Sequence, residues 1–208
     1  MAIPVIVLPF LAIAAAACPK PPPIKALVTA SEESLSVATD FHLPELRKLA
    51  QQAGRAAAHP PYGFYLGSVA YTIVVDIDNE AHDVCLGPID IRLTMQLTNR
   101  RIEVAQELKD DPCKFTKVVT HYHHHADADQ AIFERYVRLV TATLSHTPAT
   151  AFVADLAAAS VGERIARTVQ SIIEPVLASM DTDRISARKA VDTAAEVSRL
   201  ESVCTKQL

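Results

Sequence analysis

The chain has 208 residues, a length that suits one domain with an additional helical layer. Half of the residues are hydrophobic, but only 5% are aromatic and Trp is absent, which favours an aliphatic core between helices over an all-β fold. The formal net charge of -4, without a long basic run, excludes the electrostatic pattern of a nucleic-acid-binding protein.

The amino-terminal segment predicts the compartment. Residues 3–17 are uninterrupted apolar residues that end in four alanines, as a secretory signal peptide and its cleavage site require. The run is shorter than the roughly 20 residues that a membrane-spanning helix needs. The sequence therefore predicts a signal peptide over residues 1–17, a periplasmic or secreted mature protein, and no membrane span.

Cys18 and a proline-rich stretch follow the expected cleavage site. Because Cys18 comes directly after the alanines, this position loosely resembles a lipoprotein processing site, and a lipid anchor on Cys18 stays open. The prolines that follow favour a stiff, extended chain, so we expect a linker over residues 18–30.

Four cysteines lie at positions 18, 85, 113 and 204. Export to an oxidising compartment favours at least one disulfide bond among them. We expect a bond between Cys85 and Cys113, because both flank the same expected β-hairpin. Buried free thiols in a reducing compartment are the alternative.

The mature part begins with helical spacing and continues with strand-like alternation. Apolar residues at helical spacing predict one or two helices over residues 31–58, before two prolines end the pattern. Alternating apolar residues predict strands over residues 69–77 and 89–97. Residues 98–100 are expected to turn the chain into a third strand over residues 102–106. The pattern predicts a three-stranded antiparallel meander.

The carboxyl-terminal half is expected to be helical. Acidic residues before Pro112 are a good helix start, and one apolar stripe continues almost to Pro148, which predicts a long helix over residues 111–145. A second helix is expected from residue 149, with a kink or end near Pro175, and a third from about residue 182 towards residue 204. The expected fold is α+β: the meander packs on the long central helix within residues 31–146, and residues 147–208 add a helical extension.

Four of the eight histidines fall within five residues of the long helix, at positions 121, 123, 124 and 125. On a helix, His121 and His125 lie one turn apart on the same flank of the apolar stripe, and Asp129 continues this row. Two imidazoles spaced in this way can hold one metal ion, and an aspartate can supply an oxygen or orient His125. His121, His125 and Asp129 are candidate ligands, and His124 is a further one although it projects towards solvent. Solvated histidines beside a core stripe are the alternative.

The order of features from Cys85 to Leu144 resembles that of a group of secreted bacterial proteins related to the zincin-like zinc-dependent proteases. These features are a cysteine, two strands joined by a turn, a second cysteine, and a helix with histidines one turn apart. In that family the helix carries His-Glu-x-x-His, in which the histidines bind zinc and the glutamate takes a proton from water at the zinc ion. The resemblance implies a zincin-like fold and zinc, or another divalent metal, at His121 and His125.

Tyr122 occupies the position of the family's glutamate. A phenol, whose ordinary pKa is about 10, cannot act as a general base at neutral pH as a carboxylate does. Loss of a general base typically costs on the order of 10²–10⁴ in rate. The resemblance therefore implies an exported metal-binding protein that is a degenerate or weakly active zinc-dependent protease.

Two other functions stay open. One is an active metallohydrolase in which Tyr122, or a carboxylate from another helix, replaces the missing base. The other is a non-catalytic envelope protein, either a metal buffer that uses all four clustered histidines or an interaction module for a peptide or an envelope protein. Only five glycines are present, without a phosphate-binding loop or a Gly-x-Ser-x-Gly motif.

Overall fold

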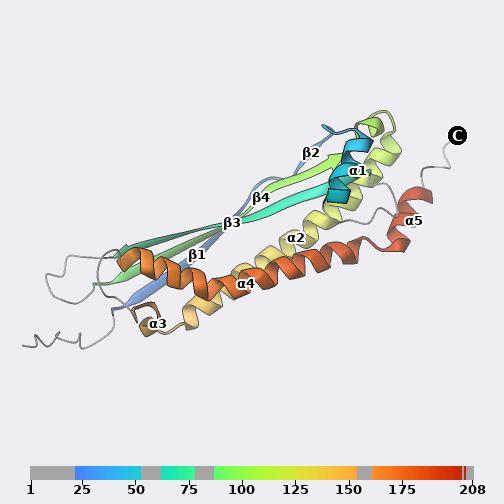
Figure 1. The fold of residues 1–208 in the computed structure, drawn as a ribbon. Helices are drawn as coiled ribbons and strands as arrows, with labels where there is room; N and C mark the ends of the chain where they lie inside the picture. The colour runs from blue at the N-terminus through green and yellow to red at the C-terminus, as the bar shows by residue number, and fades with distance from the viewer. Residues whose placement is uncertain (1–21, 53–61, 78–86, 154–160, 203, 205–208) are drawn as a thin grey trace, which may run out of the picture.

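The computed structural model describes residues 22–52, 62–77, 87–153, 161–202 and residue 204. A long β-sheet lies along one side of two long helices (Figure 1), so the expected α+β class is confirmed. The strands are β1 (Ile24–Glu32), β2 (Ser36–Ala38), β3 (Gly63–Ile77) and β4 (Ile89–Val104). The helices are α1 (Leu43–Gln52), the 3₁₀ turn η1 (Gln106–Leu108), α2 (Pro112–His146), α3 (Ala149–Val153), α4 (Val161–Val191) and α5 (Ala194–Ser202).

Strand β4 is the centre of the sheet. β3 pairs with it antiparallel along one side, from Gly63 opposite Val104 to Ile77 opposite Ile89. On the other side, β1 and then β2 pair with β4 in parallel, one after the other along its length. The described sheet is therefore mixed, and its helix-facing side presents alternate residues of β4 to the core.

The first two predicted strands pair antiparallel, as β3 and β4, but the predicted third strand is wrong, and with it the three-stranded meander and the β-hairpin expected between Cys85 and Cys113. Residues 98–100 do not turn the chain, because β4 continues through them to Val104. Asn99 adopts a positive φ of 54°, and the register with β3 shifts opposite it, between Leu66 and Ser68. Asparagine tolerates this conformation better than most residues. Asn99, which is typical of a turn in sequence, therefore forms an irregularity within one continuous strand.

The amino-terminal elements also differ from the prediction. The linker expected over residues 18–30 ends early, because β1 begins at Ile24. Of the one or two helices expected over residues 31–58, the described residues contain α1, which is preceded by the end of β1 and by β2; residues 53–58 lie outside the described part of the chain. Ile24, Ala26 and Val28 of β1 pack against the main core, so pairing with β4 outweighs the local proline-rich context. The predicted signal peptide and Cys18 lie outside the described residues.

The long central helix is confirmed, with α2 one residue later at each end than predicted. Its first turn is capped by Asp111, whose side chain accepts a hydrogen bond of 3.0 Å from the Lys114 amide, and Pro112 follows. The expected helix start near residue 182 is wrong, because α4 continues past Pro175 to Val191 with Ile173 and Met180 buried on either side of the proline. Among the described residues no helix combines the length and apolar character needed to cross a bilayer.

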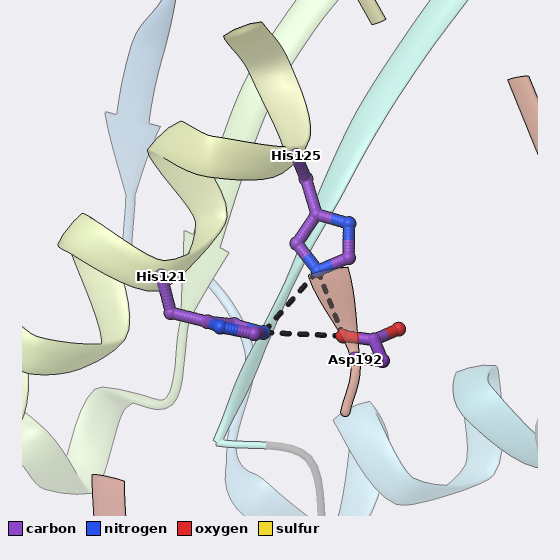
Figure 2. A group of neighbouring side chains, drawn as sticks. All are labelled: His121, His125 and Asp192. Carbon is purple, nitrogen blue, oxygen red and sulfur yellow. Dashed lines mark hydrogen bonds and ion pairs between the residues drawn. The ribbon is translucent and has the colours of Figure 1, made fainter. Parts of the chain in front are cut away.

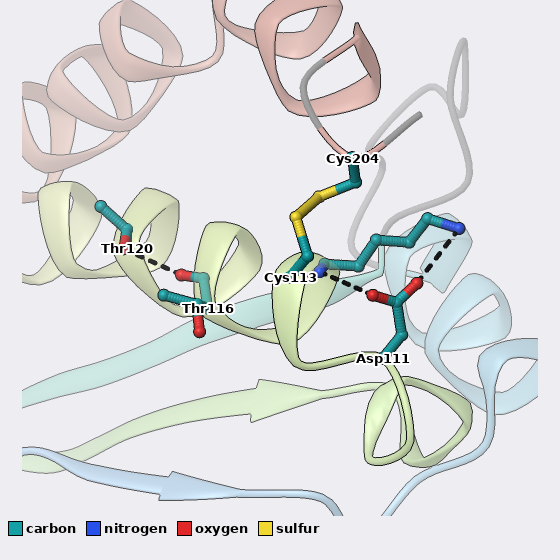
Figure 3. The surroundings of a disulfide bond; sticks show 6 residues. Asp111, Cys113, Thr116, Thr120 and Cys204 are labelled. Carbon is teal, nitrogen blue, oxygen red and sulfur yellow. Dashed lines mark hydrogen bonds and ion pairs between the residues drawn. A yellow bond between two sulfur atoms is a disulfide. The ribbon is translucent and has the colours of Figure 1, made fainter. Parts of the chain in front are cut away.

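The disulfide bond differs from the expected one. Cys113 is bonded to Cys204, with the two Cα atoms 6.0 Å apart, and the predicted partner Cys85 lies outside the described residues (Figure 3). The bond joins the first turn of α2 to the chain just after α5. The prediction was wrong because proximity to one hairpin in sequence does not reveal that the carboxyl-terminal segment folds back beside the start of α2.

The core consists of two clusters. The larger one lies between the sheet and the helices and includes Ile89, Ile91, Leu93, Met95 and Leu97 of β4, Phe133, Tyr136, Val140 and Leu144 of α2, and Ile165, Val169, Ile173 and Met180 of α4. The smaller one joins α1 to β3, β4 and α2 and includes Leu46, Tyr65, Ile102, Val104, Val118 and Ala126. Along α2 the smaller cluster ends at Ala126 and the larger one begins at Phe133. The buried polar side chains of α2 lie between Ala126 and Phe133 and in the two turns that end at Ala126.

Candidate metal site

A row of polar residues on α2 lies against a second row on α4, its carboxyl-terminal connection and α5. We call the two rows together the polar seam; it comprises His121, His125 and Asp129 of α2 and Arg184, Arg188, Asp192 and Glu196 of the facing chain. Residues with lower numbers in the α2 row face residues with higher numbers in the second row, so α2 and α4 run antiparallel. His121, His125 and Asp129 are all buried, and buried polar groups require partners.

Asp129 lies at the inner end of the seam and is satisfied by Arg184. The Arg184 guanidinium donates from Nε to Oδ1 at 2.6 Å and from Nη2 to Oδ2 at 2.9 Å, and the Tyr65 hydroxyl donates to Oδ2 at 3.0 Å. Burial, followed by the charge of Asp129 and the hydrogen bond to it, raises the pKa of Tyr65 to about 12. Asp129 therefore belongs to an ion pair, and the structure does not bring it together with the histidine pair as a third ligand.

The outer end of the seam brings two imidazoles and a carboxylate together. His121 Nε2 and His125 Nε2 are 3.2 Å apart, and Asp192 Oδ1 lies 3.2 Å from the first and 2.8 Å from the second (Figure 2). Both imidazoles are buried, whereas the Asp192 side chain is 46% exposed. The three atoms thus converge at the boundary between the packed interior and solvent, and they could hold a metal ion.

These distances can be compared with those of a metal site. Zinc binds imidazole nitrogen and carboxylate oxygen at about 2.0–2.2 Å, so neighbouring ligand atoms in a tetrahedral site are roughly 3.3–3.5 Å apart. Two of the three distances here are 3.2 Å, and the shorter contact between His125 and Asp192 would lengthen slightly. Two nitrogens and one oxygen leave a fourth position, as in zinc sites that keep three protein ligands and one open position.

The electrostatics of Asp192 suit a ligand. Partial burial raises the pKa of its carboxyl group, but the hydrogen bonds and charges of His121 and His125 outweigh burial and hold the pKa well below its usual range. Asp192 is therefore a carboxylate at neutral pH. An ionised oxygen and two imidazole nitrogens are donors that zinc accepts.

Asp192 reaches the site because the chain breaks between α4 and α5. The Asp192 amide still donates to the Arg188 carbonyl at 3.2 Å, but α4 ends at Val191. Thr193 caps the next helix, since its hydroxyl accepts a hydrogen bond of 3.2 Å from the Glu196 amide. The sequence prediction missed Asp192 because it continued one helix from about residue 182 towards residue 204. The spacing Thr193-x-x-Glu196 is that of a capping box and could have revealed the helix start, although not the contact with α2.

The other clustered histidines do not join the site. His123 and His124 are exposed on the outer face of α2, as the helical periodicity of about 100° per residue requires when His121 and His125 are buried. Within the described part of the chain, His121, His125 and Asp192 are the one group of three ligating side chains close enough to share a metal ion. The candidate ligand His124 is therefore placed apart from the other two.

Tyr122 packs beside the imidazoles without directing its hydroxyl to the three donor atoms. Its ring is stacked with His125, with the ring centroids 5.3 Å apart, and meets His121 edge-on at 4.9 Å. The hydroxyl donates a hydrogen bond to the Gly63 carbonyl of β3. A Cβ at Gly63 would lie 3.0 Å from the Tyr122 ring, so glycine allows this close approach. In this position the phenol supports the imidazoles by packing.

The site thus offers a divalent cation three donors from α2 and the connection between α4 and α5. Comparison of the chain with protein-family models, curated proteins and solved structures gives no significant match. The function of this site is therefore inferred from its own residues.

Proposed function

We propose that the protein is an exported metal-binding protein that holds zinc, or another divalent metal ion, through His121, His125 and Asp192. The observation that carries this proposal is the convergence of the three donor atoms, all within 3.2 Å of one another, beside buried imidazoles. A zinc ion held by these residues would supply a Lewis acid. Imidazole and carboxylate ligands favour zinc but do not exclude other divalent ions of the first transition row.

Export and a relation to the zincin-like proteases belong to the same proposal. The apolar segment over residues 1–17 has the features of a signal peptide, and the Cys113–Cys204 disulfide is compatible with an oxidising compartment. The histidine pair on a long helix, packed against a sheet, supports a zincin-like ancestry. In this proposal the protein is a degenerate or weakly active protease.

Zinc binding tests the proposal directly. We expect the purified mature protein to bind one zinc ion and the His121→Ala/His125→Ala variant to bind it at least about 100-fold more weakly, because even residues that only support ligands typically contribute 10- to 100-fold. Asp192→Asn should also weaken binding. Affinity is measured by competition with a chromogenic chelator.

The exposed histidines provide a matched control. His123→Ala/His124→Ala removes the same number of imidazoles from the same helix, but from its exposed face, and should leave zinc affinity unchanged. Natural protein that binds neither zinc nor another divalent ion of the first transition row would show that the proposal is wrong. Equal losses in both double variants, with several metal ions per chain, would support a metal buffer that uses all four histidines.

Hydrolytic activity is expected to be weak or absent because of Tyr122. Its hydroxyl donates to the Gly63 carbonyl, and a phenol is a poor general base at neutral pH. We expect the zinc-loaded natural protein to cleave a library of unstructured peptides no faster than His121→Ala/His125→Ala does. Tyr122→Glu, which restores the carboxylate, should gain cleavage that a chelator abolishes.

Tyr122→Phe separates the remaining possibilities. It keeps the packing against the imidazoles and removes only the hydroxyl, so the proposal expects no change in cleavage. If the natural protein already shows chelator-sensitive cleavage and Tyr122→Phe loses it, the protein is an active metallohydrolase with a substitute base. If Tyr122→Glu gains no activity, the protease ancestry loses its support and a non-catalytic role remains.

A further inference from the structure

The two ring nitrogens of His121 have different surroundings. Nε2 faces His125 and Asp192, as described above. Nδ1 is buried on the other edge of the ring without a hydrogen-bond partner among the described residues, and it lies 3.5 Å from Glu196 Oε1. The Glu196 side chain is itself mostly buried, at 21% exposure. A carboxylate thus faces the edge of the imidazole that points away from the other two donors.

The chemistry of imidazole fixes what this arrangement requires. A neutral imidazole carries a proton on one nitrogen and a lone pair on the other. When a metal ion binds Nε2, the lone pair of that nitrogen is used there, so the proton of the neutral ring is on Nδ1, where it faces the negatively charged Glu196 oxygen and can be donated to it. The tautomer with the proton on Nδ1 leaves the Nε2 lone pair pointing at the place where the other two donors converge.

We infer that Glu196 is a positioning residue of the metal site, which accepts a hydrogen bond from Nδ1 of His121 and so fixes its tautomer and ring orientation for metal binding. This inference rests on the proposed metal site. The distance of 3.5 Å is long for a hydrogen bond, and a small rotation of the Glu196 side chain would shorten it when a metal ion draws on the Nε2 lone pair. Partners of this kind are typical of histidines that bind metals.

Glu196 is not itself a ligand in this arrangement. Nδ1 and Nε2 lie on opposite edges of the His121 ring, so a carboxylate beside Nδ1 is separated from the three donor atoms by the ring. In agreement with this, the group of mutually close ligand atoms among the described residues contains Asp192 and not Glu196. Its position follows from the Thr193 cap, which starts α5 and places Glu196 in the first turn facing α2.

Zinc affinity of Glu196 variants tests the inference. We expect Glu196→Ala to weaken zinc binding about 10- to 100-fold, the usual effect of removing such a partner. Glu196→Gln retains an oxygen that can accept the hydrogen bond but loses the charge, so its affinity should lie between those of Glu196→Ala and the natural protein. Glu163→Ala is the matched control, because Glu163 is an exposed glutamate in the first turn of α4, and it should bind zinc normally.

Proton NMR provides a readout that a purely structural role would not change. The zinc-loaded natural protein should show a slowly exchanging imidazole N–H resonance that disappears in His121→Ala. The same resonance should be lost in Glu196→Ala and kept in Glu196→Gln. Thermal unfolding of the metal-free variants shows whether Glu196→Ala folds. If it does not fold, the inference is tested on Glu196→Gln alone, by its zinc affinity and its imidazole N–H resonance.

The outcomes distinguish this inference from the proposal on which it rests. If the natural protein binds neither zinc nor another divalent metal ion, the proposed function is wrong and the inference is overturned with it. If the natural protein binds zinc and a folded Glu196→Ala binds it equally well, only the role of Glu196 is overturned. The role is also overturned if Glu196→Gln binds zinc as weakly as Glu196→Ala and loses the resonance.

Discussion

Replacement of Asp129 by alanine is expected to lower the free energy of unfolding by about 3 to 5 kcal/mol, the usual cost of removing one partner of a buried ion pair. Asp129 is 1% exposed and its partner Arg184 is 8% exposed. Without the carboxylate, the Arg184 guanidinium would keep its charge in the interior with a hydrogen bond to the Gly67 carbonyl and a longer ion pair of 3.6 Å to the exposed Asp181. The Tyr65 hydroxyl would also lose its acceptor.

Urea unfolding of matched variants measures this effect. Asp127→Ala is the control, because Asp127 lies on the exposed face of the same helix and should change stability by less than about 0.5 kcal/mol. Asp129→Asn keeps the size of the side chain without its charge and should fall between the two. If Asp129→Ala is no more destabilising than Asp127→Ala, Arg184 must be able to reach solvent, and the seam would be looser than described.

The two ends of the polar seam differ in how their charges are balanced. Asp129 receives two hydrogen bonds from one guanidinium and a third from Tyr65, so this end is satisfied by the protein alone. At the other end, two ring nitrogens and a carboxylate oxygen converge on one another. A divalent cation would bind His121, His125 and Asp192 and balance the charge of that carboxylate. Arg184 balances the charge of Asp129 in the same way. The seam therefore combines a structural ion pair with a site suited to a metal ion.

Regular local patterns explain what could be predicted from the sequence. The continuous apolar stripe and the acidic residues before Pro112 predict α2 to within one residue at each end. Helical periodicity also separates His121 and His125, which are buried, from His123 and His124, which are exposed. Both predictions depend only on the 3.6-residue repeat of one long helix.

Features that depend on distant pairing could not be predicted in the same way. β1 forms because its residues pair with β4 about 65 positions later, and nothing in the proline-rich segment indicates this partner. Asp192 lies next to His125 only because α4 runs antiparallel to α2. The position of the interruption between α4 and α5, at Thr193, determines which carboxylate lies beside the histidines. The sequence pattern placed Asp129 correctly beside the histidines along the helix, but the side chain that neutralises it comes from α4.

The disulfide bond is expected to stabilise both the fold and the proposed metal site. Cys113 and Cys204 are 91 residues apart, and loss of a bond that closes a loop of this length costs about 4 to 5 kcal/mol in the chain-entropy model and about 2 to 4 kcal/mol in typical measurements. We therefore expect Cys113→Ser/Cys204→Ser to lower the free energy of unfolding by about 2 to 4 kcal/mol. Urea unfolding under non-reducing conditions measures this loss.

Zinc affinity of the same serine variant tests the link between the disulfide and the site. α5 is a short helix of nine residues, and it is held between the Asp192 connection at one end and Cys204 at the other. Since Glu196 lies in α5 and Asp192 lies two residues before it, release of the end of α5 should let both carboxylates move away from His121 and His125 and weaken zinc binding. Serine variants are preferable to chemical reduction, because free thiolates bind zinc themselves. Unchanged zinc affinity in a folded serine variant would mean that contacts between α5 and α2, without the disulfide, are sufficient to hold the two carboxylates in place.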